Sequence, residues 1–318
     1  MQQSVHGLII LNKPKAISSN SAIQQIKKQF QLKKVGHTGT LDPLATGVLP
    51  VSIGEATKFS QQLLNSNKEY LATVQLGLET DSHDLSGKVL NNYKIEQKLS
   101  TLTIRKLLET DFTGSILQTP PLFSALKHQG KPLYKYARLG NVSVKKPPRL
   151  ITIYDIELIS YDSNNQLLTF KTLVSKGSYI RVLGHDISKK ICGYGGSLTQ
   201  LCRTKVGSLT LQQSYNLEQI LQTTNISSIL HPITSLLSSD KIYHLKATEF
   251  AKISVGNSII IDKSSLINFN HQNEQAISTV IEIPLFFKQN FIGIGYYQDY
   301  KIWVKRLINS QLLFELNQ

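Results

Sequence analysis

The residues with the clearest chemical potential lie in a glycine-rich stretch at positions 36–47, which reads GHTGTLDPLATG. Asp42 precedes Pro43, and a proline pushes the residue before it out of the α region into an extended backbone. We therefore expect the Asp42 carboxylate to project from a loop, where an ionised carboxylate can act as a base or a nucleophile. By residue type alone, a loop aspartate is more often a turn or cap residue, and His37 more often a surface or packing residue, so both interpretations stay open.

The elements on either side must position Asp42. Four glycines and two prolines between positions 35 and 59 exclude a regular helix there. We expect a long ordered loop that leads into a strand near 48–53. Within it, Gly39 and Gly47 permit sharp turns or close approach by a ligand.

The remaining periodicity predicts a mixed fold. Strict alternation of apolar residues is typical of strands, and apolar residues at helical spacing are typical of helices. We expect strands over 7–14, 69–78, 150–160 and 167–174, and helices over 21–30, 101–110, 131–139 and 182–191. Because these elements lack a regular β-α-β-α rhythm, the predicted fold class is α+β, with a mixed, largely antiparallel sheet and flanking helices.

A second, smaller domain is expected at the C-terminal end. Residues 221–244 are rich in Ser and Thr and contain Pro232, which is typical of a connection. Residues 245–318 contain several short β-like runs, a pattern that fits a small β-barrel. We therefore divide the chain into a domain over 1–244 and a domain over 245–318.

Positive charge is concentrated in the larger domain. The 318 residues contain 35 Lys and Arg against 21 Asp and Glu, a formal net charge of +14. Residues 1–244 carry +13 of this surplus and residues 245–318 carry +1. Such a surplus indicates an anionic partner such as nucleic acid, although it also serves solubility.

The densest part of the surplus is the stretch 127–149, which has seven basic residues and no acidic one. Tyr134 and Tyr136 lie among these cations. Basic side chains with interleaved aromatic rings suit a phosphate backbone with exposed bases, so we favour contact with RNA or DNA over a merely solvated surface.

Other classes of protein fit the sequence less well. Cys192 and Cys202 are the only cysteines and lack the spacing of a zinc site or a disulfide framework. We find neither a GxGxxG motif nor a phosphate-binding P-loop, and expect no cofactor and no metal. No stretch approaches about 18 consecutive apolar residues, so we expect a cytoplasmic protein without a membrane partner.

Several separated motifs resemble one known family. The stretch 36–47 resembles the signature loop of pseudouridine synthases, and it closely resembles that of bacterial tRNA pseudouridine-55 synthases of the TruB type. Further matching runs follow in the family's order and cover nearly the whole chain: LNKPKAISSN, GEATKF, KEYLATVQLG, PPLFSALKHQGKPLYKYARLG, VSKGSYIRVLGHDI and GGSLTQLCRTKVG. The C-terminal tail resembles the family's PUA-type RNA-binding barrel. Ala16 departs from the pattern, because the family usually has glycine there.

The resemblance implies isomerisation of uridine 55 in the TΨC arm of tRNA, which requires no cofactor. Asp42 matches the essential aspartate, which attacks the ribose anomeric carbon or removes a proton from C2′, and the sequence leaves both routes open. Arg181 matches the arginine that pairs with this aspartate and would lower its pKa. Tyr70 matches an active-site tyrosine that stacks on uracil and whose oxygen could help remove the C5 proton.

The resemblance also implies RNA contacts. A uridine inside a folded loop must be flipped out before it can react. His37 matches the residue that fills the space left by the flipped nucleotide, Leu201 an apolar residue near the base, and Lys13 the lysine of a Lys-Pro motif. An RNA-gripping insertion at about 120–150 supplies the remaining candidates, which are Lys127, Lys131, Tyr134 and Arg138. The implied partner is the tRNA T-arm stem-loop, bound by a monomer.

Two alternatives remain at this level. The charge and the barrel alone would suit a non-catalytic RNA-binding or RNA-folding protein, and a tRNA-folding role is compatible with catalysis. The other alternative is an RNA-guided synthase of the archaeal and eukaryotic type. The residues Leu44, Ala45 and Thr46 after Asp-Pro, together with the basic insertion, favour a stand-alone bacterial enzyme that needs no guide RNA.

Overall fold

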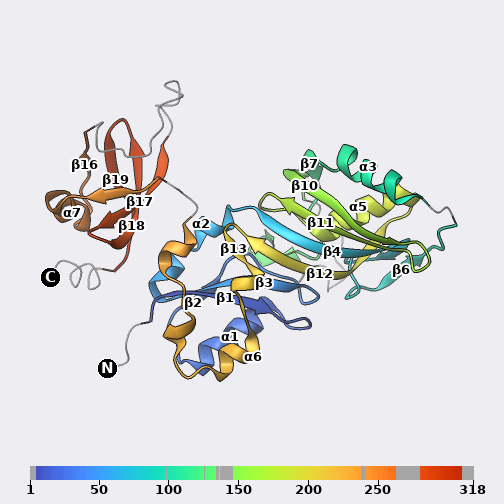
Figure 1. Ribbon diagram of the computed structural model, residues 1–318, viewed down its shortest axis with the longest axis horizontal. Helices are drawn as coiled ribbons and strands as arrows, with labels where there is room; N and C mark the ends of the chain where they lie inside the picture. Colours follow the sequence, from blue (N-terminus) through green and yellow to red (C-terminus); the bar gives the residue numbers. More distant parts are fainter. Residues whose placement is uncertain are drawn as a thin grey trace.

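The computed structural model describes residues 5–96, 99–124, 126–133, 136, 146–237, 241–262 and 280–309, with the backbone alone at 127, 128, 131 and 132. Figure 1 shows a larger body built on a long sheet and a smaller body with its own sheet. Two parts built on separate sheets agree with the architecture expected from the sequence.

The main sheet is mixed and largely antiparallel, as predicted. Its strand order is β14-β1-β3-β12-β4-β11-β10-β7, with β2 paired to β3 and β13 to β12. Among the described strands of this sheet, the pairs β1–β14 and β3–β12 are parallel and the others antiparallel. The strands are β1 (Gly7–Lys13), β2 (Val35–His37), β3 (Thr46–Ile53), β4 (Lys68–Leu76), β7 (Gly114–Gln118), β10 (Arg149–Asp162), β11 (Leu167–Val174), β12 (Gly196–Val206), β13 (Leu209–Thr210) and β14 (Tyr215–Asn216).

Helices flank this sheet. The longer ones are α1 (Ser19–Gln29), α3 (Thr101–Asp111), α5 (Ile180–Cys192) and α6 (Leu217–Gln222), and short turns are η1 (Gly54–Lys58), α2 (Gln61–Leu64), η2 (Leu211–Gln213), η3 (Ile226–Ile229) and η4 (Ile233–Leu236). Helix α1 begins where the Ser18 hydroxyl accepts from the amide of Ser21 at 3.0 Å, a side-chain N-cap. Helix α5 packs on β4 and β12, and α3 packs on β10. The predicted helices at 101–110 and 182–191 are thus confirmed.

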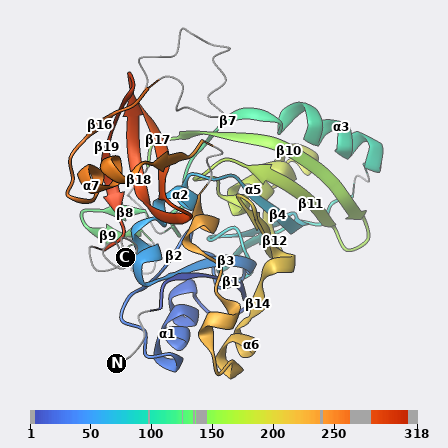
Figure 2. The ribbon, with the colours of Figure 1, turned by 60° about the vertical axis from the view of Figure 1, so that its left-hand side comes forward.

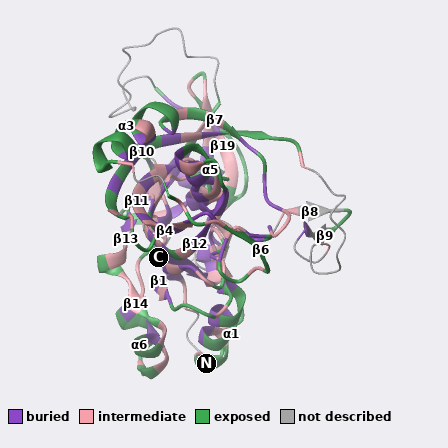
Figure 3. Ribbon diagram, turned by 90° about the vertical axis from the view of Figure 1, so that its right-hand side faces the viewer, coloured by how far each residue is buried: buried purple, intermediate pink, exposed green. Residues whose placement is uncertain are grey.

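The helix expected over 131–139 is confirmed at Leu133 and Tyr136, which are helical, and is wrong at Lys131 and Pro132. Residues 127–132 form the hairpin β8 (Lys127–His128) and β9 (Lys131–Pro132), in which His128 pairs with Lys131. Gln129 and Gly130 both have positive φ, 47° and 79°, as a two-residue hairpin turn requires. Figure 3 shows the hairpin standing away from the buried centre of the molecule. A second hairpin joins β5 (Leu78–Thr80) to β6 (Val89–Asn92).

The smaller body has a curled sheet, as Figures 1 and 2 show. In the part of it that the structure describes, this sheet has five strands and is accompanied by one helix, α7 (Ala247–Ser254). Its strand order is β15-β17-β18-β19-β16. The strands are β15 (Tyr243–Leu245), β16 (Ile259–Ile260), β17 (Ile281–Phe287), β18 (Asn290–Gln298) and β19 (Lys301–Leu307). This curled sheet agrees with the small barrel expected there, and its first strand begins at Tyr243.

Strand β1 links two apolar cores because its side chains alternate between faces. Ile9 and Leu11 belong to the core that includes α1 and α5, whereas Leu8 and Ile10 belong to a second core shared with the smaller body. The rings of Phe59 and Phe291 meet edge to face across this boundary, with centroids 5.1 Å apart. The two bodies therefore bury apolar surface against each other, next to the elements that carry the candidate site.

Candidate active site

Four of the predicted site residues line one cleft of about 280 Å³: Asp42, Tyr70, Arg181 and Leu201. They come from the loop before β3, from β4, from the first turn of α5 and from β12. Since these elements are far apart in the chain, the sheet order is what brings the four side chains together. The rest of the lining is Gly39, Thr40, Leu41, Leu64, Lys68, Ser124, Val174, Ser175, Gly177, Ser178, Tyr179, Ile180 and Arg203.

The loop that carries Asp42 is held from both sides. The Ser19 hydroxyl lies 2.9 Å from both the amide nitrogen and the carbonyl oxygen of Leu41, donating to the oxygen and accepting from the nitrogen. The amide of Ala16 donates to the carbonyl of Pro43 at 2.8 Å. Asp42 thus has an anchored neighbour on each side, which leaves its side chain to project as the sequence predicts.

Ala16 reaches Pro43 with a backbone conformation that suits glycine. Its φ is 72°, in the left-handed region where a Cβ is strained. We expect Ala16→Gly to raise the free energy of unfolding by about 1 kcal/mol, because it removes this strain and keeps the hydrogen bond to Pro43. Denaturant unfolding of both proteins measures the change, and a less stable variant would contradict the assignment of strain.

Arg181 is the most constrained group of the site. Its Nε donates to Asp42 Oδ2 at 2.9 Å, its Nη1 to the carbonyl of Ser82 at 2.8 Å and its Nη2 to the carbonyl of Phe123 at 2.6 Å. The Arg181 side chain is 5% exposed, whereas that of Asp42 is 39% exposed. The guanidinium is therefore fixed in the protein, and the carboxylate it holds remains open to a ligand.

A second carboxylate, which sequence reasoning missed, lies near the same nitrogen of Arg181. Asp84 Oδ2 is 3.7 Å from Arg181 Nε, and its side chain is buried. Its Oδ1 accepts from the hydroxyl of Ser82 at 2.7 Å and from the amide of Ser86 at 2.9 Å. Arg181 Nε thus has two carboxylates within ion-pair distance, one buried and one facing the cleft.

The pKa of Asp42 is raised from its ordinary value, which differs from the lowering expected from its arginine partner alone. Burial in the cleft is the largest cause, and the negative charge of Asp84 adds to it. The charge and hydrogen bond of Arg181 and the charge of Lys13 oppose the rise. The open side of the carboxylate, 39% exposed, limits the desolvation. The result is a carboxylate that binds a proton more strongly than a free aspartate.

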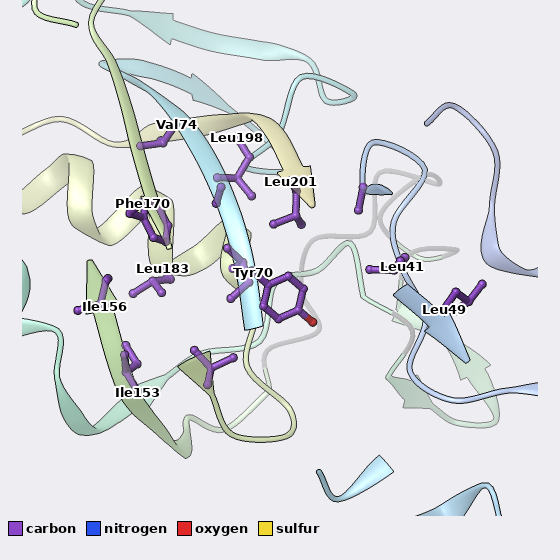
Figure 4. Close-up of a cluster of buried hydrophobic side chains, with 14 of the residues drawn as sticks. Leu41, Leu49, Tyr70, Val74, Ile153, Ile156, Phe170, Leu183, Leu198 and Leu201 are labelled. Atoms are coloured by element: carbon purple, nitrogen blue, oxygen red, sulfur yellow. The ribbon is translucent and has the colours of Figure 1, made fainter. Parts of the chain in front are cut away.

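Tyr70 and Leu201 form the apolar part of the cleft. They lie on the neighbouring strands β4 and β12, where Tyr70 is aligned with Arg203 and Leu201 with Ala72. Both are nearly buried. Figure 4 shows the Tyr70 ring extending from its strand toward the loop of Leu41, with Leu201 nearby. An aromatic face and an aliphatic side chain beside an open carboxylate suit a flat heterocycle.

Arg203 is a further cleft residue that sequence reasoning missed. Its side chain is almost completely buried, and its Nε and Nη2 donate to the carbonyls of Val48 at 2.8 Å and Gly39 at 2.9 Å. Gly47 has a φ of 102°, and a Cβ there would overlap the Arg203 backbone. Arg203 therefore holds both ends of the Asp42 loop. The sequence signal that could have placed it in the cleft is its position two residues after Leu201, on the same face of a strand.

Lys13 and His37 lie outside the cleft lining. Lys13 is completely buried, and its ammonium donates to the carbonyls of Pro14 and Ile17, each at 2.8 Å. Burial lowers its pKa to about 8. Through these bonds it shapes the turn that carries Ala16, and its expected contact with RNA stays a prediction. His37 lies on β2, half-buried, and burial and the charge of Arg203 lower its pKa.

The predicted contacts in the insertion stay predictions. Lys127 and Lys131 belong to the hairpin whose backbone alone is described, and Tyr134 and Arg138 fall outside the described residues. Within the described ranges, no group of three or more His, Cys, Asp or Glu could hold a metal ion. No helix in that same part of the chain is long and apolar enough to span a membrane.

The fold is shared with solved structures of other proteins. A chain in the structure titled "Crystal Structure of a Cbf5-Nop10-Gar1 Complex" is similar with a TM-score of 0.72 and 21% identity, covering 97% of this chain and 86% of that one. A chain in the archaeal box H/ACA sRNP Nop10-Cbf5 complex gives a TM-score of 0.69 and 20% identity, covering 97% and 88%. At these identities the similarity shows the fold.

Sequence comparison gives the family. Residues 27–180 match the TruB family pseudouridylate synthase (N terminal domain). The tRNA pseudouridine synthase B of Hydrogenovibrio crunogenus is 40% identical over 318 residues, 99% of this chain and 96% of that one. The protein of the same name from Francisella tularensis subsp. novicida is 43% identical over 249 residues, covering 75% and 81%. The chain belongs to the TruB family of pseudouridylate synthases, which are isomerases.

Proposed function

We propose that this chain converts uridine 55 in the TΨC loop of tRNA to pseudouridine. The observation that carries the proposal is the Asp42 carboxylate, paired with Arg181 at 2.9 Å and open to a cleft. Tyr70 and Leu201 give that cleft an apolar wall for a flipped base. Relatives that match over most of their length are named tRNA pseudouridine synthase B, which supports tRNA as the substrate.

Asp42 acts as the anion in either route. It attacks C1′ of the ribose, or removes the C2′ proton, and the bond between C1′ and N1 of uracil breaks. The uracil turns and C5 bonds to C1′, as the bond between Asp42 and C1′ breaks in the first route or as Asp42 returns the proton to C2′ in the second. C5 then loses its proton and N1 gains one, so the atoms balance. Arg181 and the positive end of α5, in whose first turn Arg181 lies, stabilise the carboxylate.

The base reaches Asp42 by leaving its stack, at a cost of a few kcal/mol. Tyr70 and Leu201 offset part of this cost by packing against the flipped uracil, and stacking of a base on an aromatic ring contributes about 1–3 kcal/mol. His37, on the strand before the Asp42 loop, fills the place that the nucleotide leaves.

Tyr70→Phe separates the two roles of this side chain. The variant keeps the ring that stacks on the base and loses the oxygen that assists removal of the C5 proton. We expect the rate at saturating tRNA to fall about 10²-fold, the lower range for a positioned proton-transfer group, with tRNA affinity retained. Single-turnover assays and a binding titration measure both quantities. A wild-type rate in Tyr70→Phe would show that the Tyr70 oxygen takes no part in removing the C5 proton and that the ring only stacks on the base.

The proposed partner is the T-arm of tRNA, bound in the cytoplasm by a monomer through the basic larger domain. Residues 1–244 carry +13 of the formal charge, so phosphate contacts dominate affinity. We expect kcat/KM to fall at least tenfold between about 50 and 200 mM salt, with kcat at saturating tRNA nearly unchanged. Steady-state assays across this range measure it, and a kcat/KM independent of salt would exclude a phosphate-driven encounter.

The protein is proposed to act alone. One structural neighbour lies in an H/ACA RNP bound to a substrate RNA, a multicomponent assembly. The purified chain and a synthetic T-arm stem-loop, with no other protein or RNA, test the difference. Pseudouridine in the stem-loop supports a stand-alone enzyme. Activity that appears only after a guide RNA or accessory protein is added would overturn this part of the proposal.

A further inference from the structure

Helix α5 begins without a cap of its own. Tyr179 is its N-cap residue, has extended backbone angles and makes no side-chain cap hydrogen bond. Arg181 lies in the following turn, where the helix dipole disfavours a cation. The position of the Arg181 guanidinium must therefore be fixed by groups outside the helix.

Gln118, the last residue of β7, holds the start of this helix. Its Nε2 donates to the carbonyl of Tyr179 at 3.1 Å, and its Oε1 accepts from the amide of Tyr179 at 2.7 Å. The side chain is buried, so the Tyr179 amide would lack a partner if the Gln118 amide were removed, whereas the Tyr179 carbonyl would keep the amide of Leu183 at 3.1 Å. Two hydrogen bonds from one planar amide fix both the position and the direction of the Tyr179 main chain.

The same segment of chain also contacts Arg181 directly. Phe123, five residues after Gln118, accepts from Arg181 Nη2 at 2.6 Å. Gln118 is aligned with Arg149 at the end of the β7–β10 pair, where the insertion leaves the sheet. The segment from Gln118 to Phe123, where the insertion begins, therefore hydrogen-bonds to α5 at residues 179 and 181, beside the carboxylate of the cleft.

We propose that Gln118 is a positioning residue for the reaction: by holding the main chain of Tyr179 it fixes the first turn of α5 and aims Arg181 at Asp42. Gln118 is not among the residues that line the cleft. It acts on the reaction only through Tyr179 and Arg181. The inference rests on the proposed function, because its test is the rate of pseudouridine formation.

Gln118→Met removes both hydrogen bonds and keeps the approximate volume. We expect the single-turnover rate at saturating tRNA to fall roughly 10- to 100-fold, since a displacement of about 1 Å at a reacting group can have such an effect. The affinity for tRNA should change little. The acid limb of the pH–rate profile should move to higher pH, because a displaced Arg181 stabilises the Asp42 anion less well.

Gln118→Glu is the conservative variant, and it also carries the test if Gln118→Met does not fold. It keeps an acceptor for the Tyr179 amide and loses the donor to the Tyr179 carbonyl, so its rate should lie between those of the wild type and Gln118→Met. Gln166→Met is a matched control, because Gln166 Nε2 also donates to main-chain carbonyls, those of Leu76 at 3.1 Å and Tyr93 at 3.2 Å. It should lose stability while keeping the wild-type rate and pH profile.

A double-mutant cycle decides whether Gln118 acts through Arg181. In an Arg181→Lys background, Gln118→Met should change the rate by less than about twofold, because the contact it positions is already lost. Rate effects that multiply, or a Gln118→Met protein with the wild-type rate and pH profile, would overturn the inference. A wild-type protein that makes no pseudouridine would instead overturn the proposed function, so the two failures are distinguishable.

Discussion

Replacing Asp42 with alanine should lower pseudouridine formation by about 10⁴-fold or more while tRNA still binds. No other carboxylate lines the cleft among the described residues, so no neighbour can take over the attack or the proton removal. Asp84, 3.7 Å from Arg181 Nε, is buried, and its carboxylate accepts hydrogen bonds from Ser82 and Ser86. Binding persists because the expected phosphate contacts come from basic residues elsewhere on the larger domain.

Single-turnover assays with purified protein and a binding titration with the same tRNA measure the two effects separately. Asp111→Asn is the matched control, because Asp111 is a surface carboxylate whose partner is Lys190 at 2.8 Å. Its rate should equal that of the wild type. Normal pseudouridine formation by Asp42→Ala would contradict the mechanism, and loss of binding in that variant would assign Asp42 to substrate contact.

Replacing Arg181 with glutamine should lower the rate at neutral pH by about 10²- to 10³-fold, the effect of removing one preorganised electrostatic partner. The pH dependence should change as well. The pKa of Asp42 is raised by burial and held back by Arg181, so removing the guanidinium raises it further. Because the anion reacts, activity is present above this pKa and is lost as the pH falls through it. The acid limb therefore moves to higher pH.

Arg181→Lys controls for the loss of packing, because it keeps a positive charge near Asp42 and loses the planar set of donors. Its acid limb should move less than that of Arg181→Gln, although its rate should also fall. A complete pH–rate profile of the three proteins under single-turnover conditions measures both shifts. An acid limb that stays in place in Arg181→Gln would show that the limb does not report the Asp42 carboxylate.

Strands and helices with a regular spacing of apolar residues could be predicted from the sequence. A strand whose apolar pattern is interrupted by a residue that hydrogen-bonds to the main chain could not. Strands β10 and β11 and helices α3 and α5 have regular apolar spacing and lie where the sequence indicates. Strand β12 gave no such signal, because Arg203 and Lys205 interrupt its apolar pattern. Arg203 can be buried there because its guanidinium donates to the carbonyls of Val48 and Gly39.

The composition of the insertion predicted its backbone only in part. The sequence predicts a helix over 131–139, and Leu133 and Tyr136 are helical, whereas Lys131 and Pro132 form a strand that pairs with residues 127 and 128. Gln129 and Gly130 close that hairpin as a two-residue turn with positive φ angles. The hairpin could have been predicted only by recognising this pair of residues as such a turn.

The candidate site was predictable only in part. Asp42 and Arg181 are 139 residues apart, so their pairing followed from family resemblance and not from spacing. Asp84 and Gln118 were missed because they act by holding other protein groups, and no local pattern distinguishes such residues from ordinary polar ones. Lys13 was expected to contact RNA from family resemblance. Its complete burial, with two backbone carbonyls accepting from its ammonium, could not be predicted, because lysines are seldom fully buried.

The central claim is that this chain uses Asp42 to make pseudouridine at one position of tRNA. Position-by-position mapping of pseudouridine in an unmodified tRNA, before and after incubation with the purified chain, tests it most directly. The account predicts new pseudouridine at position 55 with the wild-type protein and none with Asp42→Ala. Pseudouridine at another position alone, or none with the wild type on correctly folded tRNA, would contradict it.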